Sequence, residues 1–219
     1  MKRLAVMFGM VVVLGGLMTA GIANADVLYV GPNFTQDIYM DVPGSNSPLA
    51  LGGGSVDPSY LNGVQLKYMY CVDYSIDVYV SSYYYNSVVN SQGLVYGNPL
   101  NNADKVAWLL SNYGTAGQSD QAAALQAAIW HEVYGLNLDT SGLNNPNVVS
   151  LYSDYLTALG TNTGNVGNFL WITPMNGSTV YQGQVGAVPE PSAILLVGSG
   201  LAGLLALKRR KPRAHSNAG

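Results

Sequence analysis

The sequence predicts an α+β fold: a mainly β, sandwich- or barrel-like domain with a helical insert, preceded by a signal helix and followed by a hydrophobic helix. Three observations predict it. Residues 26–66 hold short apolar runs broken by Gly and Pro and lead into the strand-like residues 64–85, residues 102–159 have helical spacing, and residues 168–187 return to strand-like sequence. Helices that interrupt a series of strands are typical of an α+β domain. We therefore expect one folded domain over residues 26–187.

Residues 1–25 have the features of a secretory signal peptide. A basic pair follows the first Met, residues 4–17 form an apolar stretch, and Ala23-Asn24-Ala25 gives a cleavage site between small residues. We therefore expect export and a mature chain that begins at Asp26. An uncleaved anchor helix is the alternative.

The strongest strand signal lies in residues 64–85. In residues 64–70 every second side chain is Val, Leu or Tyr, and in residues 76–80 every second one is Ile or Val. This period of two, in β-branched and aromatic side chains, predicts a strand in each segment. Shorter strands are predicted at 27–30 and 38–42, because Gly and Pro follow each of these apolar runs directly.

The insert holds three predicted helices. The first, residues 104–113, carries apolar side chains at helical spacing. The second, residues 120–134, is rich in Ala, begins after the capping residue Ser119 and ends at Gly135. The third is predicted at residues 147–159. Local sequence signals therefore define the second helix best, because both of its ends are marked.

Composition limits the classes of function. The chain is 48% hydrophobic and has 16 Tyr, so it can form a core and is not a disordered polar chain. One Cys and two His exclude an intramolecular disulfide and argue against a metal site, so we expect no metal and no cofactor. Residues 26–190 hold two lysines and twelve acidic residues, a net charge of −10. Such a domain repels phosphates, so we expect no nucleic-acid partner.

The C-terminal segment, residues 188–211, has three parts. Val188-Pro189-Glu190-Pro191 comes first, an apolar run over residues 193–207 follows, and a basic cluster containing Arg209-Arg210 ends the segment. Fifteen helical residues span roughly 22 Å, which is less than the ~30 Å hydrocarbon core of a bilayer. The basic cluster favours the cytoplasmic side of a membrane. We therefore expect residues 212–219 to form a short cytoplasmic tail.

This segment resembles the PEP-CTERM sorting signal of Gram-negative bacteria, which has the same three parts in the same order at the extreme C-terminus. The resemblance implies recognition by an exosortase at the inner membrane, with cleavage near Pro189-Glu190-Pro191. It further implies transient membrane anchoring and then a place at the cell surface or in an extracellular, polysaccharide-rich matrix. An ordinary C-terminal anchor is the alternative.

Two short motifs lie in the best predicted strand and the best predicted helix, Tyr70-Cys71-Val72-Asp73 and Gln126-Ala127-Ala128-Ile129-Trp130. Together they resemble the bacterial thioester domain found in surface adhesins. The resemblance covers about residues 64–135 and implies an internal thioester between Cys71 and Gln126. The supporting residues that it implies are Tyr70, Asp73, Ala128, Ile129 and Trp130. One position departs from the family: Leu125 stands where Thr usually precedes the Gln.

The chemistry implied by the resemblance is a single covalent coupling. The Cys71 thiolate attacks the side-chain carbonyl of Gln126 and expels ammonia, which requires near-attack geometry and stabilisation of the oxyanion. A target amine or hydroxyl then attacks the thioester, forms an amide or an ester with Gln126, and frees Cys71. The protein would act once as an adhesive binder, so we expect no enzymatic turnover.

Other functions remain open at this stage. Cys71 is an ordinary buried residue in the simplest alternative, and the protein is then a structural component of an extracellular polysaccharide matrix or biofilm. Its Tyr-rich segments, Tyr79 and Tyr83-Tyr84-Tyr85, would contact the sugars. A cysteine hydrolase with a Cys71–His131 pair is a further alternative. Asp73 and Asp77 lack the spacing of a calcium loop, so we expect them on a solvated strand face.

Overall fold

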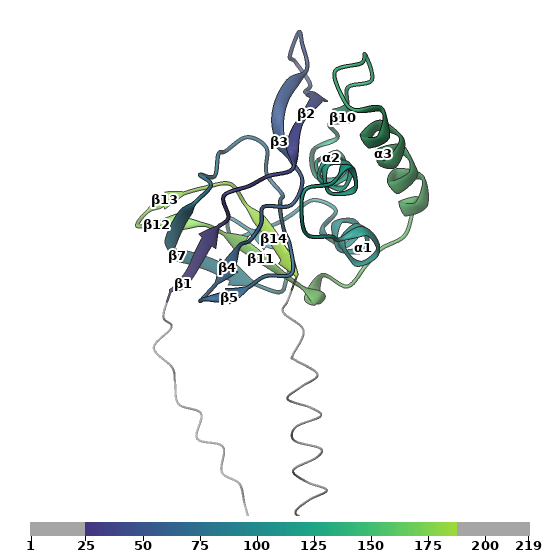
Figure 1. Cartoon of the computed structure of the whole chain (residues 1–219). Helices are drawn as coiled ribbons and strands as arrows, with labels where there is room; N and C mark the ends of the chain where they lie inside the picture. Colours follow the sequence, from purple (N-terminus) through teal and green to yellow (C-terminus); the bar gives the residue numbers. More distant parts are fainter. Residues whose placement is uncertain (1–24, 188–219) are drawn as a thin grey trace, which may run out of the picture.

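The computed structural model describes residues 25–187, which form a mostly β half-barrel with three helices (Figure 1). The expected signal peptide, the C-terminal hydrophobic helix and the short tail lie outside the described residues, apart from Ala25. Within residues 25–187, no helix is long and apolar enough to cross a bilayer. The α+β class and the helical insert between strands are confirmed.

The largest sheet has seven strands in the order β5-β4-β1-β7-β11-β14-β6, and all of its neighbouring strands are antiparallel. Their bounds are β1 Asp26–Val30, β4 Tyr60–Leu61, β5 Val64–Gln65, β6 Met69–Cys71, β7 Ser82–Asn90, β11 Phe169–Thr173 and β14 Gln184–Ala187. This order brings β6, from the first half of the chain, against β14, the last described strand. Cys71 thereby becomes the cross-strand partner of Gln184.

Three small sheets complete the β structure of the described residues. Strands β10, β2 and β3 form one sheet in that order, and the pairs β8–β9 and β12–β13 form two hairpins. Their bounds are β2 Gln36–Asp41, β3 Leu49–Gly53, β8 Leu94–Val95, β9 Asn98–Pro99, β10 Asn137–Leu138, β12 Met175–Asn176 and β13 Thr179–Val180. The three-stranded sheet contacts α2, so this helix lies among β structure as well as helices.

The helices α1 (Ala103–Tyr113), α2 (Asp120–Tyr134) and α3 (Pro146–Leu159) lie on one side of the large sheet (Figure 1). A short 3-10 helix, Val166–Asn168, follows them. The Ser119 side chain caps α2 by accepting a hydrogen bond from the Ala122 N–H, and Gly135 ends α2 in the left-handed conformation. All three helices match their predicted ranges to within one residue, because their local signals agree with their tertiary packing.

The strand predicted at residues 76–80 is wrong. The described chain has no strand between Val72 and Ser81. The main-chain N–H and C=O of Tyr79 both bond the side-chain hydroxyl of Tyr84, at 2.7 and 3.2 Å. The segment therefore satisfies main-chain groups with a side chain, and its alternating pattern does not correspond to a sheet face.

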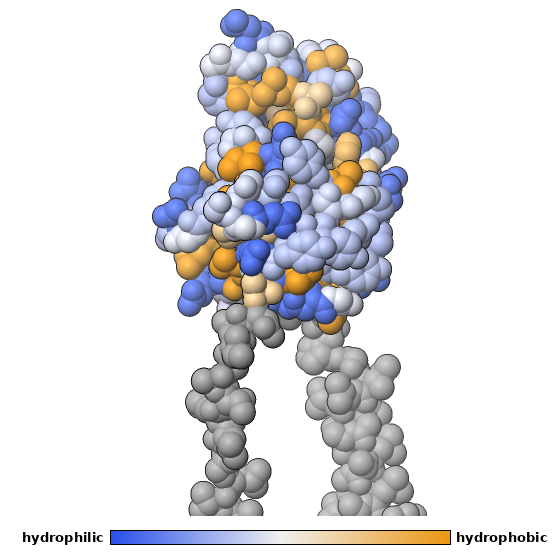
Figure 2. All heavy atoms as spheres, turned by 90° about the vertical axis from the view of Figure 1, so that its left-hand side faces the viewer, coloured by the Kyte–Doolittle hydropathy of each residue, from blue (hydrophilic) through white to orange (hydrophobic). Residues whose placement is uncertain are grey.

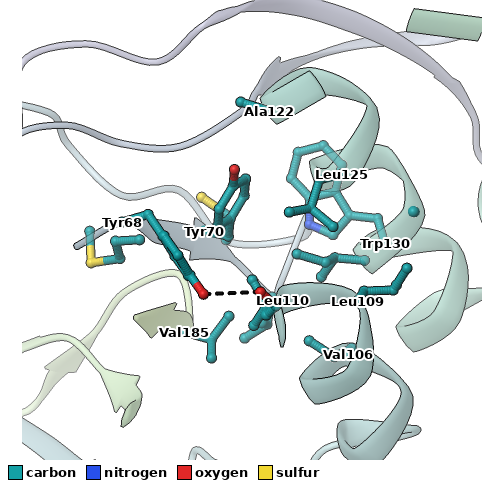
Figure 3. Packing of buried hydrophobic residues seen from close by; sticks show 14 of the residues in the cluster. Tyr68, Tyr70, Val106, Leu109, Leu110, Ala122, Leu125, Trp130 and Val185 are labelled. Atoms are coloured by element: carbon teal, nitrogen blue, oxygen red, sulfur yellow. Dashed lines mark hydrogen bonds between the residues drawn. The ribbon is translucent and has the colours of Figure 1, made fainter. Parts of the chain in front are cut away.

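One hydrophobic core joins the large sheet to the helices (Figure 3). Tyr70 in β6 and Tyr68, which directly precedes this strand, fix the strand to the helical layer. The Tyr68 hydroxyl donates to the Leu110 carbonyl at 3.0 Å, and the Tyr70 hydroxyl donates to the Thr115 carbonyl at 2.7 Å. Strand β6 is thus held from both sides, by β14 in the sheet and by the end of α1 across the core.

Candidate functional site

Cys71 is the last residue of β6 and is buried. The pKa of its thiol is raised from 9.0 to about 12, chiefly by burial; the Gln184 side-chain hydrogen bond lowers this pKa and the carboxylate of Asp73 raises it. The thiol is therefore neutral near pH 7. A buried neutral thiol behaves as an apolar side chain unless a reaction partner lies within reach.

The Gln126 carboxamide holds the main chain of Cys71. Its Oε1 accepts a hydrogen bond from the Cys71 N–H at 3.0 Å, and its Nε2 donates to the Cys71 C=O at 2.7 Å. Gln126 is completely buried in the middle of α2. Both ends of the Gln126 amide thus bond the main chain of Cys71.

Two other glutamine side chains contact the Cys71 sulfur. Gln184 Nε2 donates to Sγ at 3.4 Å, and the thiol donates to Gln182 Oε1 at 3.1 Å. The Oε1 of Gln184 is buried and has no hydrogen-bond partner among the described residues. Sequence reasoning missed both glutamines. The available signal was an amide side chain at position 184, at the start of an otherwise apolar strand segment that is wholly buried.

The Tyr96 hydroxyl links Asp73, two residues after Cys71, to Gly183, which lies between Gln182 and Gln184. The Tyr96 hydroxyl donates to Asp73 Oδ2 at 2.6 Å and accepts from the Gly183 N–H at 2.7 Å. The Gln182 Nε2 also donates to the Asp73 carbonyl oxygen. Burial raises the pKa of Tyr96, and Asp73 raises it further. Asp73 is buried within this network, which corrects the expectation that it lies on a solvated strand face.

The supporting residues expected on α2 are all buried. Ala128 and Ile129 are fully enclosed, and Leu125, which stands in the usual Thr position, packs in the core beside Trp130 (Figure 3). Trp130 is only 1% exposed, and its Nε1–H has no hydrogen-bond partner among the described residues. An unpaired buried donor costs free energy unless a ligand or an intermediate accepts from it.

A cavity of about 340 Å³ leads to Cys71. Gln182 and Trp130 line it together with Cys71, and the exposed side chains of Phe34, Tyr79 and Val80 also contribute to its wall. Among the described residues, Asp77 is the one charged side chain in this wall. Because exposed and buried residues share the wall, the cavity connects the sulfur to solvent. A small nucleophilic group on a larger molecule can enter it.

His131 does not pair with Cys71 through Nδ1. This nitrogen lies 2.8 Å from the Leu136 carbonyl oxygen and 3.0 Å from the Tyr152 hydroxyl. His131 is therefore held on the side of α2 that faces Tyr152. This placement gives no support to a nucleophile–base pair.

Two family models match parts of the chain. Residues 68–162 match the thioester domain, and residues 187–211 match the PEP-CTERM protein-sorting motif. No curated protein and no solved structure matches the chain. The first match includes Cys71 and Gln126 and ends before Gln184. Both resemblances seen in the sequence are thereby confirmed.

Proposed function

We propose that this protein, which carries a thioester domain and a C-terminal PEP-CTERM sorting motif, binds a surface partner covalently through a thioester between Cys71 and Gln184. The sorting motif makes it a surface protein that is processed by an exosortase at the membrane. The observation that supports the bond is the contact of the Gln184 amide with the Cys71 sulfur at 3.4 Å.

Strand pairing favours Gln184 as the acyl partner over Gln126. Cys71 and Gln184 are directly opposite in the β6–β14 register, where Cβ atoms lie about 4.5–5.5 Å apart. The carbonyl carbon of Gln184 is one bond from the Nε2 that already contacts Sγ. The Gln126 amide instead bonds the main-chain N–H and C=O of Cys71. Each of the two glutamines thus has a separate task.

Bond formation follows from this arrangement. The sulfur attacks the Gln184 carbonyl carbon, the carbon–nitrogen bond breaks, and the thiol proton leaves on nitrogen as ammonia. Because the pKa of the thiol is raised, the thiolate is scarce, and close placement must offset that scarcity. The Trp130 Nε1–H is the candidate donor to the carbonyl oxygen, since it is buried, unpaired among the described residues and in the wall of the same cavity.

The second step consumes the bond. An amine of the target enters the cavity and attacks the thioester carbonyl, sulfur leaves and regains a proton, and an amide joins the target to the side chain of residue 184. Asp77, with no Lys or Arg beside it among the described wall residues, favours a cationic amine over an anionic target. A hydroxyl would give an ester by the same route. Each molecule reacts once, so the protein is a binder rather than an enzyme.

Intact mass tests the proposal. We expect the purified protein to weigh one ammonia less than calculated, and methylamine to convert Gln184 into its methylamide. Cys71→Ala should show the full calculated mass and take up no methylamine. Peptide mapping that places the methylamide on Gln126 would reject the assignment to Gln184 while leaving the thioester intact.

The alternative is a non-covalent structural protein of an extracellular matrix. It predicts the full calculated mass, a Cys71 that is alkylated freely after unfolding, and an unaltered Gln184. Hydrolysis of a formed thioester instead converts the Gln184 carboxamide into a carboxylate, so peptide mapping distinguishes the two cases. Full mass without that conversion would reject covalent coupling.

A further inference from the structure

A row of tyrosines crosses three neighbouring strands of the large sheet. Tyr29 on β1 is the cross-strand partner of Tyr60 on β4 and of Tyr83 on β7. The ring centroid of Tyr29 lies 6.0 Å from that of Tyr60 and 4.8 Å from that of Tyr83. Tyr85, two residues along β7, stacks on Tyr83 at 6.0 Å with an interplanar angle of 17°. We call these four residues the tyrosine platform.

The platform lies on the outer face of the sheet. The alternate residues of the same strands, Leu28, Val30 and Tyr84, are buried in the core, whereas Tyr83 is 53% and Tyr85 60% exposed. Figure 2 views the molecule from the side of β7, β12 and β13, where residues of intermediate hydropathy cover much of the surface. A cavity of about 240 Å³ lies on the platform, with walls from Tyr29, Tyr60, Tyr83, Val27 and Gly63.

Two asparagine side chains bond the main chain of the strands that carry the tyrosine platform. The Asn176 side chain accepts from the Tyr85 N–H and donates to the Tyr83 carbonyl, each at 3.1 Å. On the other side, the Asn62 side chain accepts from the Val27 N–H at 2.9 Å. Rings carried on paired strands and fixed at both margins keep their spacing before a ligand arrives. Such preorganisation lowers the entropy cost of binding.

We propose that the tyrosine platform is a second, non-covalent binding site for neutral glycan chains. Tyrosine offers a ring face to sugar C–H groups and a hydroxyl to sugar hydroxyls. No charged side chain of the described residues lines the cavity, so neither an acidic nor a basic ligand finds a counter-charge there. Residues 25–187 carry two lysines against eleven acidic residues, which disfavours acidic polymers. The site does not depend on the Cys71–Gln184 bond.

The spacing of the rings favours a chain over a single sugar. Neighbouring strands lie about 4.7–4.9 Å apart, and the three paired tyrosines lie in a line across them. A ligand that runs across the strands contacts several rings in turn. We therefore expect binding to strengthen with the number of sugar units.

Affinity electrophoresis of the full protein tests this site. The probes are two soluble neutral glucans, hydroxyethyl cellulose and dextran, and the anionic alginate. We expect at least one glucan to retard the protein and alginate not to. Tyr83→Ala and Tyr29→Ala should each weaken retardation about 3- to 10-fold, by loss of ring stacking. Val88→Ala, equally exposed on β7 but outside the platform, should leave retardation unchanged.

Cys71→Ala separates the two proposals, because it removes the thioester and should leave retardation unchanged. Equal retardation of the wild type and the platform variants, retardation by alginate alone, or no retardation by either glucan would overturn the glycan site. Self-association that Tyr83→Ala abolishes would assign the platform to a second copy of the chain and would equally overturn it.

Discussion

Gln126 holds both main-chain polar groups of Cys71, which lies 55 positions earlier in the chain. The amide accepts from the N–H at 3.0 Å and donates to the C=O at 2.7 Å. A residue at the edge of the large sheet is thereby fixed by a helix that packs behind it. This clamp leaves the sulfur facing Gln182 and Gln184.

A comparison of Gln126→Met with Gln184→Met should show which glutamine holds the main chain of Cys71 and which one forms the thioester. Gln126→Met leaves two buried backbone groups unpaired, so we expect it to lower the free energy of unfolding by about 2 kcal/mol or more. It should still lose ammonia. Gln184→Met should keep the full mass. Urea denaturation and intact mass measure both effects, and the reverse pattern of masses would make Gln126 the partner.

Trp130→Phe should slow the reaction of the proposed thioester more than it affects the fold. Removal of one oxyanion donor costs about 10²–10³ in rate in enzymes, so we expect methylamine uptake to slow at least about tenfold. Trp171→Phe is the matched control, because Trp171 is also buried but its Nε1–H donates to the Val166 carbonyl at 3.0 Å. Equal rates in both variants would contradict the proposed bond from the Trp130 N–H to the carbonyl oxygen.

Tyr96→Phe should misplace the segment that carries Gln184. The hydroxyl joins Asp73 to the Gly183 N–H, so its loss removes one hydrogen bond from a buried carboxylate and one from a main-chain donor. We expect a loss of stability of about 1–3 kcal/mol and a lower fraction of molecules that have lost ammonia. Tyr152→Phe, which removes a hydroxyl bonded to His131, should destabilise the protein without changing that fraction. An unchanged fraction in Tyr96→Phe would leave this hydroxyl a purely structural role.

The free thiol should react slowly with alkylating agents until strongly alkaline pH. Once methylamine has opened the thioester, burial keeps the pKa of Cys71 near 12, above its ordinary value of 9.0. The folded state then holds the thiol proton more tightly than the unfolded state. This stabilisation is complete below pH 9 and declines as the pH rises toward 12. Iodoacetamide labelling across this range, with urea-unfolded protein as the control, measures the shift; identical pH profiles would contradict it.

The elements that have local signals could be predicted from the amino-acid sequence. Ser119 and Gly135 mark the ends of α2 because a side-chain cap and a left-handed glycine each act within one helical turn. The motifs around Cys71 and Gln126 carried the resemblance to the thioester domain, whose family model matches residues 68–162, and residues 188–211 carried the resemblance to the sorting motif. The alternating apolar pattern at residues 76–80 gave a wrong strand prediction, because a period of two does not specify which strand the segment pairs with.

Which glutamine side chains contact the sulfur depends on the long-range pairing of strands. Cys71 and Gln184 are 113 positions apart, and they meet because β14 inserts between β11 and β6. The tyrosine platform likewise exists only because β4, β1 and β7 pair in one register. Strand order and register depend on how the whole core packs, since each strand's own pattern fits many neighbours equally well. Local sequence therefore supplied the chemical groups, and long-range pairing set which of them meet.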